Sequence, residues 1–187
     1  MSRAQFDSQQ VVQNAMQLFW QQGYSGASMQ DVTAATGLKP GSIYLAFTNK
    51  DGLYKASLQR YAQQTIEFIE STIAQAPNVK KGICNILNIM INESIETQFY
   101  SCFLVRSRME LPQSSALHQF TGELLTELEN CFAKQLSTQY EQALADQYAG
   151  VLMIQIFGIR VYGYHQNSGE KLRAAIQTSL PWLDWET

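Results

Sequence analysis

The sequence predicts an all-α protein, in which a small N-terminal three-helix domain precedes a larger helical one. Apolar residues recur at spacings of three and four along most of the 187 residues, as on one face of an α-helix. Capping residues, glycines and prolines separate these segments. Alternating, strand-like segments are nearly absent, and 45% hydrophobic residues allow a sizeable core.

The first two helices have clear boundaries. Asp7 or Ser8 is a suitable N-cap for an amphipathic helix whose apolar stripe continues to Gly23. Ser28 and Asp31 form a capping box at the start of a short second helix.

A glycine-containing turn and a proline define the third helix. Gly37 can end the second helix in the left-handed conformation. Pro40 suits the first turn of a helix over about 41–47, because its missing N–H has no partner there anyway. Thr48 and Asp51 form a second capping box for a long helix. We therefore expect one domain over residues 1–49 and another over 50–187, connected by a helix over 50–75.

This pattern is typical of a helix-turn-helix DNA-binding domain, whose second helix enters the major groove. Gly41 and Ser42 would let backbone N–H groups approach a phosphate at a helix N-terminus. Lys39 and Tyr44 can reach the DNA backbone or a base edge, and Lys50 a phosphate. Each side chain alone fits a solvated lysine or a core-edge tyrosine about as well, but together they favour DNA.

Charge is divided unevenly along the chain. Residues 1–60 carry a net charge of +2 and the remainder −5. This small asymmetry suits a polyanionic partner for the first part only.

Several motifs between residues 11 and 54 resemble the N-terminal domain of TetR-type transcriptional repressors. They are A-x-x-L-F-W-x-x-G-Y at 15–24, S-M-Q-D-V-T-A-A-T-G-L at 28–38, G-S-I-Y-L-A-F at 41–47 and N-K-D-G-L-Y at 49–54. The resemblance implies an all-helical homodimer that binds a palindromic double-stranded DNA operator and leaves it when a ligand binds the larger domain.

The same resemblance places DNA contacts on particular residues, which are Ser28, Lys39, Ser42, Tyr44 and Lys50. The sequence departs from the usual pattern at Pro40, which replaces a frequent lysine, and at Leu45 and Ala46, which replace a polar or aromatic pair. Base recognition through apolar contact with thymine methyl groups is favoured by this departure. The candidate DNA-binding residues therefore also include Pro40, Gly41 and Leu45.

The second domain must be interpreted from periodicity alone. Helices are expected over 79–90, 102–111, 114–136, 142–164 and 170–182. Because the helix over 142–164 is apolar on nearly every side, we expect the last two helices to form a homodimer interface.

Aromatic and polar side chains of this domain would suit an effector pocket. The candidates are Phe99, Cys102, Phe103, Phe120, Phe157, Arg160 and Tyr164, although most fit ordinary packing. Arg160 needs a partner in so apolar a helix. That partner is either an interface carboxylate, such as Glu170 or Asp146, or an anionic effector.

Cys102 offers an alternative trigger. The segment S-C-F-L-V at 101–105 resembles part of a TetR-family branch that includes sensors of reactive electrophiles. Cys102 is either a reactive thiol, with Arg106 and Arg108 nearby to favour the thiolate, or a small buried apolar residue. The odd number and wide spacing of the three cysteines indicate reduced thiols, not disulfides or a zinc site.

Other classes of function find little support. His118 and His165 have no metal-ligand spacing, and catalytic, phosphate-binding and dinucleotide motifs are missing. We therefore expect no enzyme, cofactor or metal. The acidic second domain disfavours a DNA-architectural protein. Without a signal peptide or an apolar stretch of bilayer length, a cytoplasmic location and no membrane partner are expected.

Overall fold

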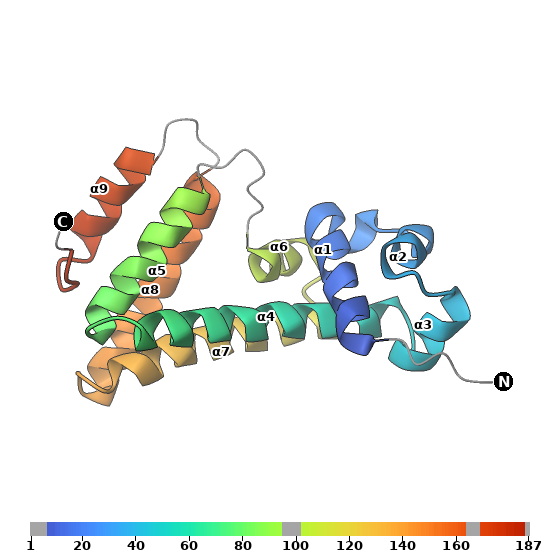
Figure 1. The fold of residues 1–187 in the computed structure, drawn as a ribbon, viewed down its shortest axis with the longest axis horizontal. Helices are drawn as coiled ribbons and strands as arrows, with labels where there is room; N and C mark the ends of the chain where they lie inside the picture. Colours follow the sequence, from blue (N-terminus) through green and yellow to red (C-terminus); the bar gives the residue numbers. More distant parts are fainter. Residues whose placement is uncertain (1–6, 95–101, 164–168, 186–187) are drawn as a thin grey trace. The chain divides into compact units, whose positions relative to one another are not determined.

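The computed structural model describes residues 7–94, 102–163 and 169–185. Within these ranges the chain forms helices and no strands, which confirms the predicted all-α class (Figure 1). The helices are α1 (Ser8–Gly26), α2 (Met29–Thr36), α3 (Pro40–Phe47), α4 (Lys50–Ala74), α5 (Val79–Glu93), α6 (Phe103–Glu110), α7 (Ala116–Leu136), α8 (Gln142–Tyr162) and α9 (Gly169–Ser179). None of the helices described combines the length and the apolar character needed to cross a membrane.

The helices group into two compact units. The first comprises residues 1–63 and 103–125, and the second comprises 64–102 and 126–187. Helices α4 and α7 contribute to both, and α6 belongs to the first unit although it follows α5 in the chain. The functional division at residue 50 concerns DNA and effector binding, and it stays a prediction.

Apolar side chains of α1 to α4 form the core of the first unit. The fully buried ones are Ala15, Phe19, Val32, Ile43, Leu53, Tyr54 and Leu58. Burying a large apolar side chain contributes about 1.5–3 kcal/mol. This core therefore fixes α3 to the other helices through Ile43.

The boundaries of α2 and α3 follow the predicted local signals. The Ser28 hydroxyl accepts from the Asp31 N–H at 3.2 Å, and the Asp31 carboxylate accepts from the Ser28 N–H at 2.8 Å. These two bonds complete the capping box. Gly37 ends α2 with a φ of 70°, and Pro40 is the first residue of α3.

The predicted cap of α4 is wrong by one residue. Thr48 ends α3 with a φ of 71°, whereas an N-cap residue is normally extended. The Asn49 side chain instead accepts from the Gly52 N–H at 2.9 Å. A Cβ at Gly52 would lie 1.9 Å from the Phe47 carbonyl oxygen. Only glycine lets α3 and α4 meet this closely.

In the second unit α5 packs against α8 and α9. The buried apolar side chains of these three helices include Ile83, Leu87, Ile91, Leu152, Ile156, Leu172 and Ile176. α8 also has an exposed apolar face, which carries Leu144, Val151, Ile154, Val161 and Tyr162. The two faces together explain why its sequence is apolar on nearly every side.

Candidate DNA interface

Helix α3 presents apolar side chains to solvent. Tyr44 is 52% exposed and Leu45 is 76% exposed. Ile43, which lies on the face of α3 that packs into the core, is 0% exposed. Ala46 is exposed as well. A helix with a buried anchor and an outward row of this kind has the form of a recognition helix.

The first turn of α3 carries the predicted phosphate contacts. Lys39, Pro40 and Gly41 are exposed, and the Lys39 side chain takes no part in capping the helix. The Ser42 N–H already donates to the Lys39 carbonyl at 2.9 Å. Of the two predicted amide donors to a phosphate, Gly41 is therefore favoured over Ser42. A Cβ on Gly41 would meet no atom within 4 Å, so space for close approach is present.

Two other predicted DNA-binding side chains also hold the fold. The Ser28 hydroxyl takes part in the capping box with Asp31, donating to its carboxylate at 2.5 Å. Lys50 is half-buried, and its Nζ donates to the Tyr24 carbonyl at 2.6 Å. The role of all these residues in DNA binding stays a prediction.

Tyr24 is a functional candidate that the sequence analysis missed. Its ring lies under the Lys50 ammonium, with 4.4 Å from Nζ to the ring centroid. Its hydroxyl donates to the Asp51 carboxylate. Burial and that carboxylate together raise the pKa of Tyr24 to about 12, so the hydroxyl stays protonated at neutral pH. The tyrosine thus joins the end of α1 to the start of α4.

Helix α6 holds the same end of α1 through two charged side chains. The Glu110 carboxylate accepts from the N–H groups of Tyr24 at 3.0 Å and Ser25 at 2.7 Å. Arg106 donates to the Trp20 and Gln21 carbonyls at 2.7 and 3.1 Å. Because the bonded residues are 85 or 86 positions apart in the sequence, no local sequence pattern predicts these contacts.

The predicted effector residues do not gather in one described pocket. Phe103 is 1% exposed and packs its ring edge-on against Tyr54 and Tyr61. The Phe120 ring lies 4.3 Å from the Lys55 ammonium. These two phenylalanines belong to the first unit, whereas Cys102, Phe157 and Arg160 belong to the second. Phe99 and Tyr164 lie outside the described residues.

Arg160 has a carboxylate partner that the sequence analysis did not name. Its guanidinium lies 3.1 Å from the Glu93 carboxylate, and 16% of the Arg160 side chain is exposed. The partner is thus a carboxylate of the same chain, Glu93 on α5, and neither of the predicted carboxylates, Glu170 and Asp146, is the one observed. An anionic effector would have to compete with Glu93.

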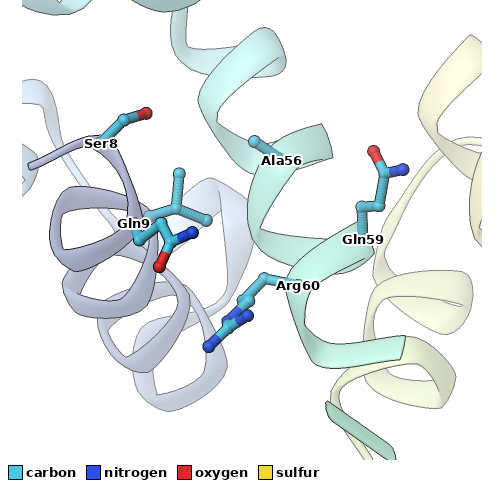
Figure 2. A pocket seen from close by; sticks show the side chains of 6 residues that line it. Ser8, Gln9, Ala56, Gln59 and Arg60 are labelled. Atoms are coloured by element: carbon cyan, nitrogen blue, oxygen red, sulfur yellow. The ribbon is translucent and has the colours of Figure 1, made fainter. Parts of the chain in front are cut away.

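A small pocket opens between α1 and α4 in the first unit (Figure 2). Its volume is about 230 Å³, and it is lined by Ser8, Gln9, Val12, Ala56, Gln59 and Arg60. None of the predicted effector residues lines it. Its volume is also below the range of about 300–1,000 Å³ typical of ligand pockets.

The cysteines differ in their surroundings. Burial raises the pKa of Cys84 and of Cys131 to about 11, which disfavours their thiolates at neutral pH. Cys102 is 7% exposed. Of the two arginines expected to assist it, Arg106 bonds α1 and Arg108 donates to His118 Nδ1 at 2.7 Å. Across the described residues no cluster of three or more His, Cys, Asp or Glu side chains suits a metal ion.

A capped α2, a glycine turn and an outward-facing α3 define a helix-turn-helix regulator. Residues 11–57 match the family model for bacterial regulatory proteins of the tetR family. The HTH-type transcriptional repressor ComR of Escherichia coli (strain K12) is 48% identical over 56 residues, covering 30% of this chain and 27% of ComR. The HTH-type transcriptional regulator YezE of Bacillus subtilis (strain 168) is 23% identical over 130 residues, covering 68% of this chain and 67% of YezE.

A solved structure extends the similarity to the whole fold. A cysteine mutant of the TetR family transcriptional regulator CifR, complexed with 26bp double-strand operator DNA, is 25% identical with a TM-score of 0.80. The match covers 100% of both chains. Residues 11–57 are thus a helix-turn-helix domain of the tetR type, and the fold of the whole chain is like that of a TetR family transcriptional regulator of known structure. The relatives named here are transcriptional regulators, which agrees with the expectation that the chain is not an enzyme.

Proposed function

We propose that the chain is a sequence-specific repressor that binds a palindromic operator as a homodimer and leaves it when a small molecule binds the C-terminal part. The observation that carries the proposal is the outward face of α3, where Tyr44 and Leu45 are exposed and Ile43 is anchored in the core. The repressor name of ComR and the operator DNA bound to CifR support it.

Recognition of bases would depend on Leu45 and Tyr44, and positioning on Lys39, Lys50 and the Gly41 amide. Leu45 is 76% exposed and has the apolar surface that a thymine methyl group prefers. Lysine contacts with phosphate add affinity without sequence preference and make binding depend on salt. The two groups of residues should therefore differ in how their replacement acts.

The test is selection of sites from random duplex DNA by the purified protein. We expect a palindrome, with Leu45→Ala relaxing the preference at thymine positions. Lys39→Ala should weaken all sequences alike and reduce the salt slope by about 0.9. Met109→Ala is the matched control, because Met109 is 82% exposed but lies on α6. No enrichment over random DNA would reject the proposed DNA-binding function.

Dimerisation would use the exposed face of α8. Leu144, Val151, Ile154 and Val161 recur at spacings of seven and three, as in the seam between paired helices. A Cβ on Gly158 would meet no atom within 4 Å, so the same face also has room for a close helix. Ile154 is 69% exposed, and Ile154→Glu would put a charge into the centre of this face.

Sedimentation equilibrium measures the expected outcome. Ile154→Glu should shift a dimer to monomers, whereas Met109→Glu, the same kind of change on α6, should remain dimeric. A dimer unaffected by Ile154→Glu would place the interface elsewhere and refute the assignment to α8.

Release by an effector would act as a population shift between two arrangements of the chain. Helix α4 contributes residues to both compact units, so it is a continuous route from the C-terminal part to Lys50. Of the predicted effector residues, Cys102, Phe157 and Arg160 lie in the second unit. A metabolite panel tested for release of the selected operator would identify the effector. If no compound that binds the protein changes operator affinity, this step of the proposal is wrong.

An electrophile sensor at Cys102 is the second candidate. One observation favours it, because Cys102 is buried and directly precedes α6, the helix that holds the end of α1. An adduct on a buried thiol would have to displace its neighbours along the chain. Quinones and aldehydes should then release operator from the wild type and not from Cys102→Ser. Equal release from both proteins would exclude this trigger.

A further inference from the structure

We propose that Glu110 on α6 is a positioning residue for Lys50, and that it acts through Tyr24. The inference rests on the proposed function, because it takes Lys50 to contact a DNA phosphate. It adds a residue that neither the sequence motifs nor the position of α6 in the chain would single out.

Both backbone polar groups of Tyr24, its N–H and its carbonyl, are hydrogen-bonded to charged side chains. Its N–H donates to Glu110 Oε2 at 3.0 Å, and its carbonyl accepts from Lys50 Nζ at 2.6 Å. Its ring lies 4.4 Å from the same Nζ, and its hydroxyl donates to Asp51. A shift of the Tyr24 backbone would therefore move the two groups, carbonyl and ring, that determine where the Lys50 ammonium lies.

Glu110 is itself fixed against the end of α1. Its other oxygen accepts from the Ser25 N–H at 2.7 Å. Gly23 has a φ of 81°, and a Cβ there would lie 2.7 Å from Glu110 Oε2. The carboxylate can approach the turn only because residue 23 lacks a side chain. One turn earlier on α6, Arg106 donates to the Trp20 and Gln21 carbonyls of α1.

A second connection returns from Tyr24 to α6. The rings of Tyr24 and Tyr54 meet edge-on with centroids 4.9 Å apart. The buried Tyr54 hydroxyl hydrogen-bonds the Ser107 hydroxyl at 2.6 Å. Helix α6 thus contacts the backbone of Tyr24 directly through Glu110, and its ring indirectly through Tyr54. Together these contacts restrain both the position of Tyr24 and the rotation of its ring.

Lys50 gains a fixed direction from this arrangement. An ammonium has three N–H donors, of which the Tyr24 carbonyl takes one and the ring face a second. The third N–H of Lys50, at the start of α4, can donate to an oxygen of a DNA phosphate. A lysine that is already ordered loses less rotamer freedom when DNA binds. A loosened Tyr24 should therefore weaken the phosphate contact of Lys50.

Because Glu110 is negatively charged, its role as a positioning residue can be distinguished from plain electrostatic repulsion of DNA. Removing an acidic charge from a DNA-binding unit should by itself strengthen DNA binding, because it reduces repulsion of the phosphates. Removing a positioning residue should weaken it. Glu123→Gln is the matched control, because Glu123 is an exposed glutamate of the same unit that bonds only a neighbouring glutamine in the described contacts.

The experiment is a double-mutant cycle on the selected operator, measured over a range of salt concentrations. We expect Glu110→Gln to weaken binding about tenfold and to lower the salt slope, as Lys50→Ala does by about 0.9. The double variant should bind no more weakly than Lys50→Ala alone, because the glutamate acts through the lysine. Glu123→Gln should bind as the wild type does or slightly more tightly.

Two results would overturn the inference while leaving the proposed function intact. They are additive effects of the two replacements and a Glu110→Gln variant that binds as tightly as Glu123→Gln. A salt slope unchanged by Lys50→Ala would also overturn the inference, because it would remove Lys50 from the proposed phosphate contacts, although operator binding itself would stand. Glutamine keeps the size of the side chain and one acceptor oxygen, and circular dichroism checks that the variant is folded. A wild-type protein that selects no operator would instead reject the proposed function itself.

Discussion

Replacement of Gly52 by alanine tests the close approach of α3 and α4 in the first unit. The added Cβ would lie 1.9 Å from the Phe47 carbonyl oxygen, whereas carbon and carbonyl oxygen normally remain about 3.3 Å apart or more. The two backbones would have to separate by about 1.4 Å, and overpacking of this kind costs about 3 kcal/mol. For a chain of this size that cost corresponds to a Tm lower by about 6–12 °C.

Thermal unfolding followed by circular dichroism gives the answer, with Gly41→Ala as the control. Gly41 is also in a helix, but its Cβ would meet no atom within 4 Å. The control should be as stable as the wild type or up to about 1 kcal/mol more stable, since alanine favours helices. If Gly52→Ala unfolds at the same temperature as Gly41→Ala, the close meeting of α3 and α4 is not real.

Further predictions concern the turn, the capping box and the thiols. Gly37→Ala has free space but a φ of 70°, so it should lose about 1 kcal/mol from strain alone, and urea unfolding unchanged from wild type would contradict this. Hydrogen bonds from Ser28 hold the pKa of Asp31 below its ordinary value, so their stabilisation is present above the ordinary carboxyl pKa and is lost as the pH falls through the lowered one. In an NMR titration Ser28→Ala should raise the Asp31 pKa, and no change would refute the assigned cause. With pKa values of about 11, Cys84 and Cys131 should be about one part in ten thousand thiolate at pH 7. Mass spectrometry should therefore find them alkylated far more slowly than a free cysteine, and equal rates would show that the two thiols are accessible to solvent.

Helix caps and turns, which depend on neighbouring residues, were predictable from the sequence, whereas contacts between distant segments were not. The capping box at Ser28, the left-handed Gly37 and Pro40 at the start of α3 depend on neighbours within a few residues, and all are confirmed. The cap of α4 failed because Thr48 and Asn49 both suit an N-cap. The left-handed φ that Thr48 adopts at the end of α3 leaves that role to Asn49.

Long-range partners have no such local signal. The apolar pattern of its helix predicted that Arg160 needs a partner, yet that partner, Glu93, is 67 positions away and was not identified. Glu110 was likewise an ordinary acidic residue until the structure placed it on the Tyr24 backbone, 86 positions away. Lys50 was predicted as a DNA contact, but its bond to the Tyr24 carbonyl was not. Such pairings depend on how helices pack in three dimensions.

The division of the first unit into residues 1–63 and 103–125 limits how this regulator can be recombined. A chimera that carries only the N-terminal segment would lack Arg106 and Glu110, so the Trp20 carbonyl and the Ser25 amide would lose the charged side chains that bind them. Transferring the proposed operator preference to another regulator therefore requires that α6 is transferred together with α1 to α3. A foreign α6 would serve only if it supplied a cation and an anion at the same two positions.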